Sequence, residues 1–546
     1  MDHKFAPLKH TSYIQQYHTT NSCHVTLLWA GAQTIDSTNA MKNARCYAVM
    51  PGPRPLPLLG NSWRFALGRK PWRTRTLDVT LWFLRALAGA GGAAKVAKLF
   101  GHPDLVFPFC AEETARIYRR EDVMPHRAVA PCLRYYKQDL RKDFFGDEPG
   151  LIGIHGERWS RFRSKVSKAL VAPEAARAAV PDLEYVTNDF VDRMESILDD
   201  NRELPKDFLT ELYKWALESV GAWAFGSRLG CFKDKDTETQ EIIRCIHGFF
   251  HSVPELELSA PLWRLYSTPA YKTYIEALDA FRSLCLKRLT DKGVCAQIAK
   301  ASGEKVATIL ALDLLLVGVD TTAAAAASTI YLLANNKRAQ RKLQNELDNN
   351  LPKNRIMHSK DLDKLQYLKA CLKESLRLVM KPVILGNGRC IQSDAVISGY
   401  EVPKGVSPDL IQKHQMQPAI TITMFLSSQS HIVFPHYILS NEERYFPSPE
   451  LYAPERWLRE SEATEQKEVG IHPFASLPFG FGRRMCIGKR FAEAELQILL
   501  AKIFHRYDVS WRHGELTYSV TPTYIPNEPL QFTLNKRNYE ELPASN

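Results

Sequence analysis

Regular cysteine pairs and long runs of one charge are both missing from this sequence. The eleven cysteines among 546 residues lie scattered, without a Cys-x-x-Cys pair, which argues against a secreted disulfide scaffold and favours a reducing compartment. The formal net charge is +11, yet no nucleic-acid module surrounds the basic residues. We therefore expect no nucleic-acid partner. An acidic protein or a membrane surface is the preferred partner, and a solvated basic surface without a partner is the alternative.

Residues 1–50 contain few acids and no long apolar run. Asp2 and Asp36 are their only acids, and the apolar run 25–32 is far shorter than the roughly 20 residues of a membrane-spanning helix. Serine, threonine and asparagine are abundant, with a weak basic bias. This composition predicts a mitochondrial targeting segment, and a disordered tail is the equal alternative.

The proline-rich segment 51–60 cannot be helical and marks the expected start of one large domain, residues 51–546. Beyond it, apolar residues spaced three and four apart predict helices near 155–171, 175–200, 206–225, 269–290, 305–334, 338–350, 361–380 and 488–506. Strand-like segments are few: 105–109, 395–402 and part of the carboxyl end. The expected fold class is mostly α with a minor β-sheet region.

Residues 306–334 form a nearly uncharged stretch that only Asp313 and Asp320 interrupt. As a helix this stretch would be roughly 45 Å long, enough to cross a membrane. A long helix buried in the core is the preferred interpretation. A spanning helix with a functional carboxylate is the alternative.

One cysteine, Cys486, lies in a glycine-rich loop directly before a predicted amphipathic helix. The surrounding pattern fixes Phe479, Gly482, Arg484, Cys486 and Gly488. A helix amino terminus carries unpaired N–H groups and positive partial charge, which would lower the pKa of the thiol and stabilise a metal-bound sulfur. The two glycines permit close approach to a flat macrocycle, and Arg484 can pair with a carboxylate on it.

This loop resembles the haem-binding loop of the cytochrome P-450 family, and the resemblance extends from about residue 50 to the end. Without it, Cys486 would be interpreted as a buried structural cysteine. The resemblance implies the cytochrome P-450 fold and haem b, iron protoporphyrin IX, with Cys486 as the axial thiolate. Phe479, Gly482, Arg484 and Gly488 would belong to the cofactor site. An axial thiolate favours cleavage of the O–O bond.

Glu374 and Arg377 are three residues apart on the predicted helix 361–380, so their side chains share one face. Most such pairs are exposed and stabilise a helix only weakly. Together with Arg456 they resemble the family's Glu-x-x-Arg pair and its second arginine. The resemblance implies a buried structural network that holds the chain near the haem.

Trp159 and Arg163 are four residues apart and also share a helix face. The residues alone favour a packed aromatic beside a solvated arginine. The resemblance implies instead that both side chains donate to haem propionates. Arg389 resembles a further propionate-binding arginine.

Gly318, Asp320 and Thr321 interrupt the long apolar helix. Thr321 can simply bond the carbonyl of Val317, as buried helical threonines usually do. The resemblance implies that Asp320 and Thr321 deliver protons for oxygen activation and that Gly318 leaves room for oxygen.

Lys369 and Lys373, four residues apart, form a small basic cluster, for which a solvated stripe is the plain explanation. In the mitochondrial branch of the family, which 124–127 and 477–492 also resemble, lysines at these positions receive an acidic [2Fe–2S] ferredoxin with its NADPH-dependent reductase. The resemblance implies a monooxygenase that inserts one oxygen atom from O2 into a lipophilic substrate, a sterol, ecdysteroid or xenobiotic. It also implies peripheral association with the mitochondrial inner membrane, on its matrix side.

Residues 407–432 depart from the family pattern and are expected to be an atypical insertion that the fold tolerates poorly. A catalytically impaired variant is therefore one alternative. A haem-thiolate isomerase or dehydratase that does not use O2 is a second, and a non-enzymatic haem carrier or sensor is a third. The pair Asp320 and Thr321 argues against the second and third alternatives.

Overall fold

The computed structural model describes most of the chain between residues 44 and 537. The described ranges are 44–53, 87–89, 92–96, 104–121, 124–127, 130–233, 237–258, 261–288, 292–352, 355–379, 388–404, 430–458, 471–520, 522–527 and 529–537. The expected targeting segment therefore lies almost entirely outside the described residues.

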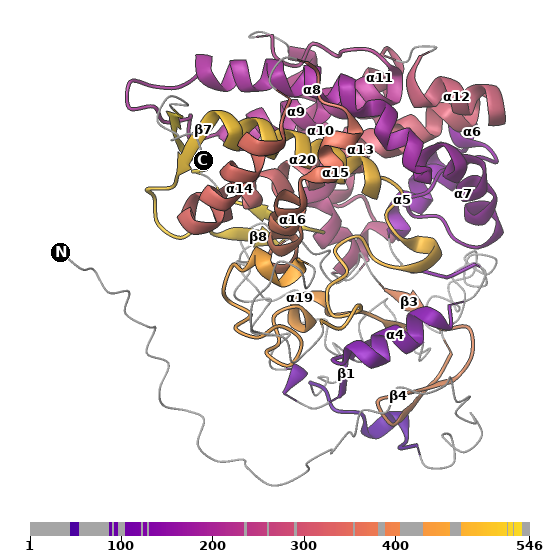
Figure 1. Ribbon diagram of the computed structural model, residues 1–546. Helices are drawn as coiled ribbons and strands as arrows, with labels where there is room; N and C mark the ends of the chain where they lie inside the picture. The colour runs from indigo at the N-terminus through magenta and orange to yellow at the C-terminus, as the bar shows by residue number, and fades with distance from the viewer. Residues whose placement is uncertain are drawn as a thin grey trace. The chain divides into compact units, whose positions relative to one another are not determined.

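Helices make up most of the described chain, and Figure 1 shows them gathered around α13. The longer ones are α7 (Gly156–Val171), α8 (Pro173–Ser196), α9 (Phe208–Phe225), α10 (Thr237–Leu258), α11 (Pro269–Leu286), α12 (Gly293–Ser302), α13 (Glu304–Asn335), α14 (Lys337–Asn350), α16 (Gln366–Leu378) and α20 (Lys489–Arg506). The shorter ones are α4 (Ala111–Arg119), α5 (Pro131–Tyr135), α6 (Lys142–Phe145), α15 (Ser359–Lys364) and α19 (His436–Leu439).

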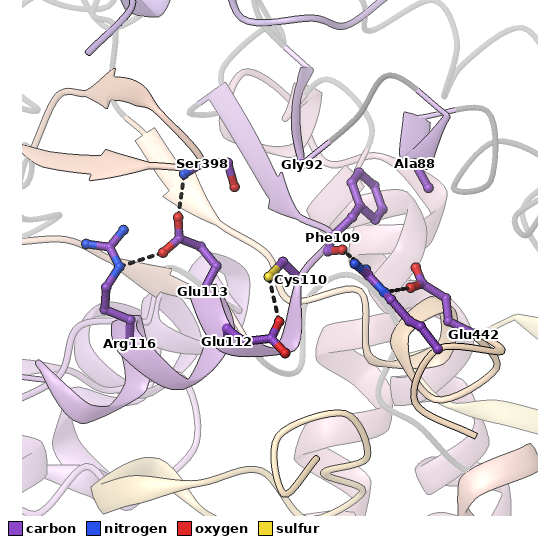
Figure 2. Close-up of a pocket in the computed structure, with 10 residues that line it drawn as sticks. Ala88, Gly92, Phe109, Cys110, Glu112, Glu113, Arg116, Ser398 and Glu442 are labelled. Atoms are coloured by element: carbon purple, nitrogen blue, oxygen red, sulfur yellow. Dashed lines mark hydrogen bonds and ion pairs between the residues drawn. The ribbon is translucent and has the colours of Figure 1, made fainter. Parts of the chain in front are cut away.

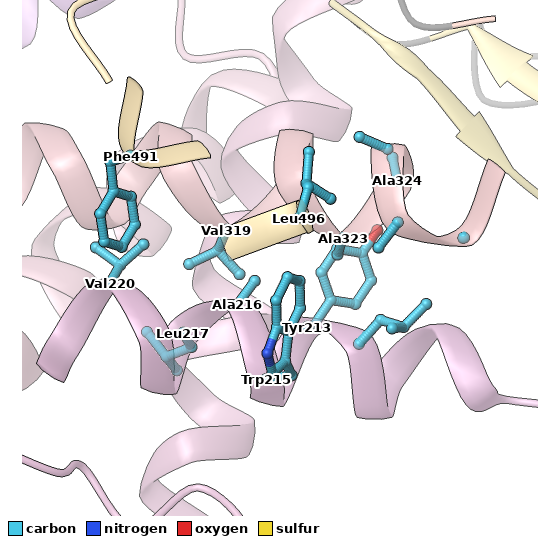
Figure 3. Close-up of a cluster of buried hydrophobic side chains, with 14 of the residues drawn as sticks. Tyr213, Trp215, Ala216, Leu217, Val220, Val319, Ala323, Ala324, Phe491 and Leu496 are labelled. Carbon is cyan, nitrogen blue, oxygen red and sulfur yellow. The ribbon is translucent and has the colours of Figure 1, made fainter. Parts of the chain in front are cut away.

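The core forms where α9 and α20 pack against α13. Figure 3 shows Trp215 and Val220 of α9 beside Val319 and Ala323 of α13, with Phe491 of α20 close by. Alanine side chains on α13 let the bulky side chains of α9 approach closely. The apolar stretch of α13 is long enough to span a membrane, but 83% of it is buried inside the protein, which supports the core helix over the spanning one.

Each predicted helix has an observed counterpart, with one division and several omissions. The helix predicted over 361–380 is two helices, α15 and α16, which meet at Leu365, where φ −81° and ψ 73° leave the helical region. The apolar spacing did not predict α10, α12 or the short helices α4, α5, α6 and α19. The fold class, mostly α with a minor β-sheet region, is confirmed.

A small four-stranded sheet and three strand pairs complete the described chain. The four-stranded sheet has the order β1 (Ala93–Val96), β2 (Asp104–Pro108), β6 (Ser430–Ile432) and β3 (Arg389–Cys390). Strands β2 and β6 are parallel, and the other neighbours are antiparallel. The pairs are β4 (Ala395–Ile397) with β5 (Tyr400–Val402), β7 (Tyr507–Ser510) with β10 (Thr533–Lys536), and β8 (Tyr518–Val520) with β9 (Tyr524–Pro526).

The sheet includes the end of the predicted insertion 407–432. The last three residues of this segment form β6, which is buried and lies between β2 and β3. The insertion itself stays a prediction. Residues 407–429 lie outside the described residues.

The folded unit also begins earlier than the predicted residue 51. It starts at Ala44, and the backbone N–H of Arg45 donates to the carbonyl of Gly399 at 2.8 Å. The backbone N–H of Glu401 returns a bond to the carbonyl of Arg45 at 2.9 Å, and Met50 is buried. Residues 44–50 are therefore part of the domain.

Candidate active site

The loop that carries Cys486 is a short turn between a 3-10 segment and α20. The backbone N–H of Cys486 donates to the carbonyl of Phe479 at 2.9 Å, and the N–H of Gly488 points at the cysteine sulfur. Gly482 has φ +74°, and a Cβ there would collide with the carboxylate of Glu121. The positive φ favours a glycine at position 482, and any other residue would also have to displace the Glu121 side chain.

Cys486 is exposed and yet is surrounded by many protein atoms. Burial raises the pKa of its thiol, and the Gly488 N–H and the guanidiniums of Arg163 and Arg127 oppose that rise. The helix terminus was expected to lower the pKa, but desolvation outweighs it here. A stable thiolate at Cys486 therefore needs a further positive charge, such as a metal ion.

Four arginines gather around this loop: Arg127, Arg163, Arg389 and Arg484. Arg163, on α7, donates to the carbonyl of Met485 at 3.2 Å. The guanidinium of Arg484 lies 3.6 Å from the centre of the Trp159 ring. Segments far apart in the sequence thus bring Trp159, Arg163 and Arg484 together beside the cysteine.

The four arginines bring more positive charge to this region than the neighbouring carboxylates balance. Burial, together with the charges of Arg127, Arg389 and Arg163, lowers the pKa of Arg484 to about 8. Burial and Arg389 lower the pKa of Arg127 to about 10. The buried Nε of Arg127 has no hydrogen-bond partner among the described residues. Two carboxylates placed here would neutralise this charge, so the site fits a haem whose propionates reach the arginines.

Arg389 already has one anionic partner. Its guanidinium is paired with the carboxylate of Glu121 and also donates to the carbonyl of Phe481 at 3.2 Å. It therefore lies at the site, as predicted, but a propionate would share it with Glu121. The predicted propionate contact of Arg389 stays a prediction.

The middle of α13 presents two different faces. One face is partly accessible and carries Val317, Gly318 and Thr321. The Thr321 hydroxyl donates to the carbonyl of Val317 at 2.9 Å, which is the simple structural role that the sequence also allowed. Asp320 is fully buried on another face. The two predicted proton donors are neighbours in the sequence but do not point the same way.

Gly318 has a packing role as well. A Cβ at this position would lie 3.3 Å from Val220 on α9, which is a tight contact. The absence of a side chain lets the two helices approach one another. Room for oxygen beside Gly318 stays a prediction.

The sequence patterns did not indicate a second buried carboxyl, Glu495 on α20. It accepts a hydrogen bond from Thr322 on α13 at 3.0 Å, and burial raises its pKa well above the ordinary value. Burial therefore favours the neutral form of this carboxyl. The available signal was a glutamate within the run 494–501, in which Gln497 is the one other polar residue.

Glu374 joins α16 to the chain around residues 453–457. The guanidinium of Arg377 donates to both of its oxygens at 2.8 Å, and the Nε of Arg456 donates at 3.0 Å. The indole N–H of Trp457 adds a bond at 2.8 Å and the backbone N–H of Ala453 one at 3.1 Å. Glu374 and Arg377 are fully buried, so the structure brings the predicted trio together.

The opposite face of α16 carries the two predicted partner lysines. Lys373 is exposed, and Lys369 is partly exposed with its ammonium 3.9 Å from Asp363. Lys489 and Arg490, at the start of α20, act with both lysines on the carboxylate of Glu493. The four cations therefore form one basic cluster next to the Cys486 loop.

A pocket of about 590 Å³ lies elsewhere, near the start of α4. In Figure 2 its polar side chains are paired with one another: the Cys110 thiol with Glu112, Glu113 with Arg116, and Arg444 with Glu442. None of its lining residues belongs to the Cys486 loop. Its polar groups are already satisfied, so we assign it no role.

Comparison with known proteins decides the family. The family model described as Cytochrome P-450 matches residues 130–407 and 412–537, which is more than half of the chain. This chain belongs to the cytochrome P-450 family. Cytochromes P-450 are monooxygenases that incorporate molecular oxygen and bind haem through a cysteine thiolate, and so the cofactor expected from the sequence is confirmed.

Two curated relatives come from Drosophila melanogaster. The probable cytochrome P-450 49a1 is 45% identical over 93% of this chain and 85% of its own. The probable cytochrome P-450 301a1, mitochondrial, is 38% identical over 93% of this chain and 90% of its own. Such relatives support the mitochondrial-type branch.

Among solved structures, the haem domain of cytochrome P-450DA matches with a TM-score of 0.66. It is 18% identical, and the match covers 90% of this chain and 98% of that one. This likeness supports the fold alone.

Loss of the Cys486 sulfur is expected to abolish the thiolate spectrum while leaving the fold intact. The Cys486→Ala variant should lose the red-shifted Soret band of the reduced carbon monoxide complex, because the other described cysteines lack this loop. Cys371→Ala, which removes another buried thiol, is the control and should keep the band. Persistence of the band in Cys486→Ala would rule out Cys486 as the ligand.

Loss of the Glu374 charge is expected to destabilise the protein strongly. In Glu374→Gln two guanidiniums lose their buried anion, which should lower the free energy of unfolding by about 3–5 kcal/mol. Urea unfolding of the haem-loaded chain measures this loss of stability. The control is Glu401→Gln, which changes an exposed glutamate. Equal midpoints for the two variants would show that the network contributes little.

Proposed function

We propose that this cytochrome P-450 takes electrons from an acidic [2Fe–2S] ferredoxin, reduced by an NADPH-dependent reductase, and oxidises a lipophilic substrate. The substrate would be a sterol, an ecdysteroid or a xenobiotic. The enzyme would act on the matrix side of the mitochondrial inner membrane. The observation that carries this proposal is the basic cluster beside the Cys486 loop.

The basic cluster is Lys369, Lys373, Lys489 and Arg490. Burial raises the pKa of Glu493, and these four cations oppose that rise, so one carboxylate faces four positive charges. The excess charge gives an acidic partner a defined place to bind and steers its approach. Because the cluster adjoins the cysteine loop, a partner bound there would lie close to the haem.

When bound, haem with an axial thiolate supplies the oxygen-activating chemistry. Trp159, Arg163, Arg127 and Arg484 would hold its propionates, and Cys486 would hold its iron. Thr321 and Asp320 would supply protons from α13. These side chains contribute binding, orientation and proton transfer only.

Peripheral membrane contact is supported by apolar side chains in and near the short turn Leu262–Arg264. Leu265 is 73% exposed and Tyr266 is 57% exposed, and Leu262 and Tyr135 are also exposed. A group of exposed apolar and aromatic side chains next to Arg264 suits a membrane interface. Relatives named as mitochondrial support the compartment.

Reversal of the two lysine charges is expected to slow ferredoxin-driven turnover. The double variant Lys369→Glu with Lys373→Glu should lose about tenfold or more in apparent ferredoxin affinity, and the wild-type rate should fall as salt rises, because exposed charges are screened within about 10 Å at 0.1 M. The control is Lys206→Glu with Lys272→Glu, which changes the net charge equally at exposed positions. Peroxide-driven turnover should survive in both. An equal loss by the peroxide route would contradict a partner-binding role.

Removal of the Thr321 hydroxyl is expected to uncouple electron use from product. Thr321→Ala should keep haem and substrate binding but divert reducing equivalents to hydrogen peroxide, because one proton donor is lost. Thr329→Ala removes a similar hydroxyl bonded to the carbonyl of Ala325 at 2.8 Å on the same helix and serves as the control. Equal coupling in the two variants would reject the role of Thr321.

A further inference from the structure

Asp320 is a fully buried carboxyl that turns away from the accessible stripe of α13. Neither of its oxygens has a hydrogen-bond partner at ordinary distance among the described residues. Burial raises its pKa to about 7, and an interaction with the side chain of Tyr213 opposes this rise. The Tyr213 hydroxyl thus lies near the carboxyl. A buried carboxyl without a close partner is costly and calls for a functional explanation.

Tyr213 brings this hydroxyl from α9. Its ring is buried, and in Figure 3 it extends toward α13 beside Ala323, one helical turn from Asp320. Among the described residues, no other side chain contributes a charge or a hydrogen bond to the pKa of Asp320. Tyr213 is therefore the polar link between this carboxyl and the rest of the protein.

Two histidines of α10 continue from Tyr213 toward the surface. The ring of His247 lies edge-on to the Tyr213 ring with the centroids 4.5 Å apart, and the ring of His251 follows at 5.9 Å. Both histidines are partly exposed, whereas Nε2 of His247 is buried without a hydrogen-bond partner among the described residues. Burial lowers the pKa of His247 to about 4, so the ring is neutral near pH 7 and has a site to accept a proton.

We propose that Tyr213, His247 and His251 form a proton path that replenishes Asp320 from solvent. The inference rests on the proposed proton-delivery role of Asp320. The three side chains act through Asp320 and do not touch the reacting atoms, so they are positioning and relay residues.

In the relay, His251 takes a proton from solvent water and passes it to His247. The Tyr213 hydroxyl gives its proton to the Asp320 carboxylate, and the tyrosine oxygen receives a proton from His247. Bridging water spans the gaps between the rings. One O–H or N–H bond forms for each one that breaks, so a single proton crosses and the three side chains return to their starting states.

The first measurement follows the protonation of Asp320 in the haem-loaded full chain by infrared difference spectroscopy. The Asp320→Asn variant identifies its carboxyl band. In Tyr213→Phe the titration midpoint should move up by about 0.5 to 1 pH unit, because a group that favours the carboxylate is lost. Tyr274→Phe is the matched control, since it removes another buried hydroxyl that has no partner among the described residues. Its midpoint should equal that of the wild type.

The second measurement is the share of reducing equivalents lost as hydrogen peroxide. Tyr213→Phe and His247→Phe should raise it about 3- to 10-fold at unchanged substrate affinity, and Tyr274→Phe should not. An unmoved midpoint in Tyr213→Phe, or an unchanged peroxide share in the two relay variants, would overturn the path. If Asp320→Asn itself leaves the share unchanged, the proposed role of Asp320 fails as well, so the two failures are distinguishable.

Discussion

Repulsion among buried arginines is the constraint on which the site depends. Burial lowers the pKa of both Arg127 and Arg484, and the charge of Arg389 adds to both shifts. Glu121 is the carboxylate that opposes the two shifts. Such a cluster is unfavourable unless a ligand brings negative charge. A haem with two propionates and an iron that takes the Cys486 thiolate would relieve both the cationic excess and the cost of a buried thiolate. The site is therefore built for a ligand with anions at one edge and a cation at its centre.

The rest of the fold holds this cluster in place. Glu374 receives donors from its own helix and from residues 453–457, so the segment before the cysteine loop is tied to α16. Helix α13 packs against both α9 and α20. Because α16 also carries Lys369 and Lys373 on its outer face, the network that stabilises the site also orients the surface proposed for the electron donor. One helix thus carries both the structural network and the proposed partner surface.

The sequence predicted those features that short spacing determines. The cysteine loop, the trio Glu374, Arg377 and Arg456, and the long helix lie where the patterns indicated. Contacts between distant segments were missed, because no local spacing encodes them. Arg127 lies near Arg484 only in the folded chain. Asp320 and Thr321 diverge because adjacent helical residues point about 100° apart. The end of the predicted insertion is a strand because β2 and β3 both pair with it.

The central claim is that the arginine cluster is built to receive two carboxylates. The most direct test compares the affinity of the haem-free full chain for iron protoporphyrin IX and for its dimethyl ester, in which both carboxylates are neutral. Each charge-assisted hydrogen bond to a guanidinium contributes about 1.5–3 kcal/mol, so the ester should bind about 100-fold more weakly or worse. Equal affinity for the two compounds would contradict the account.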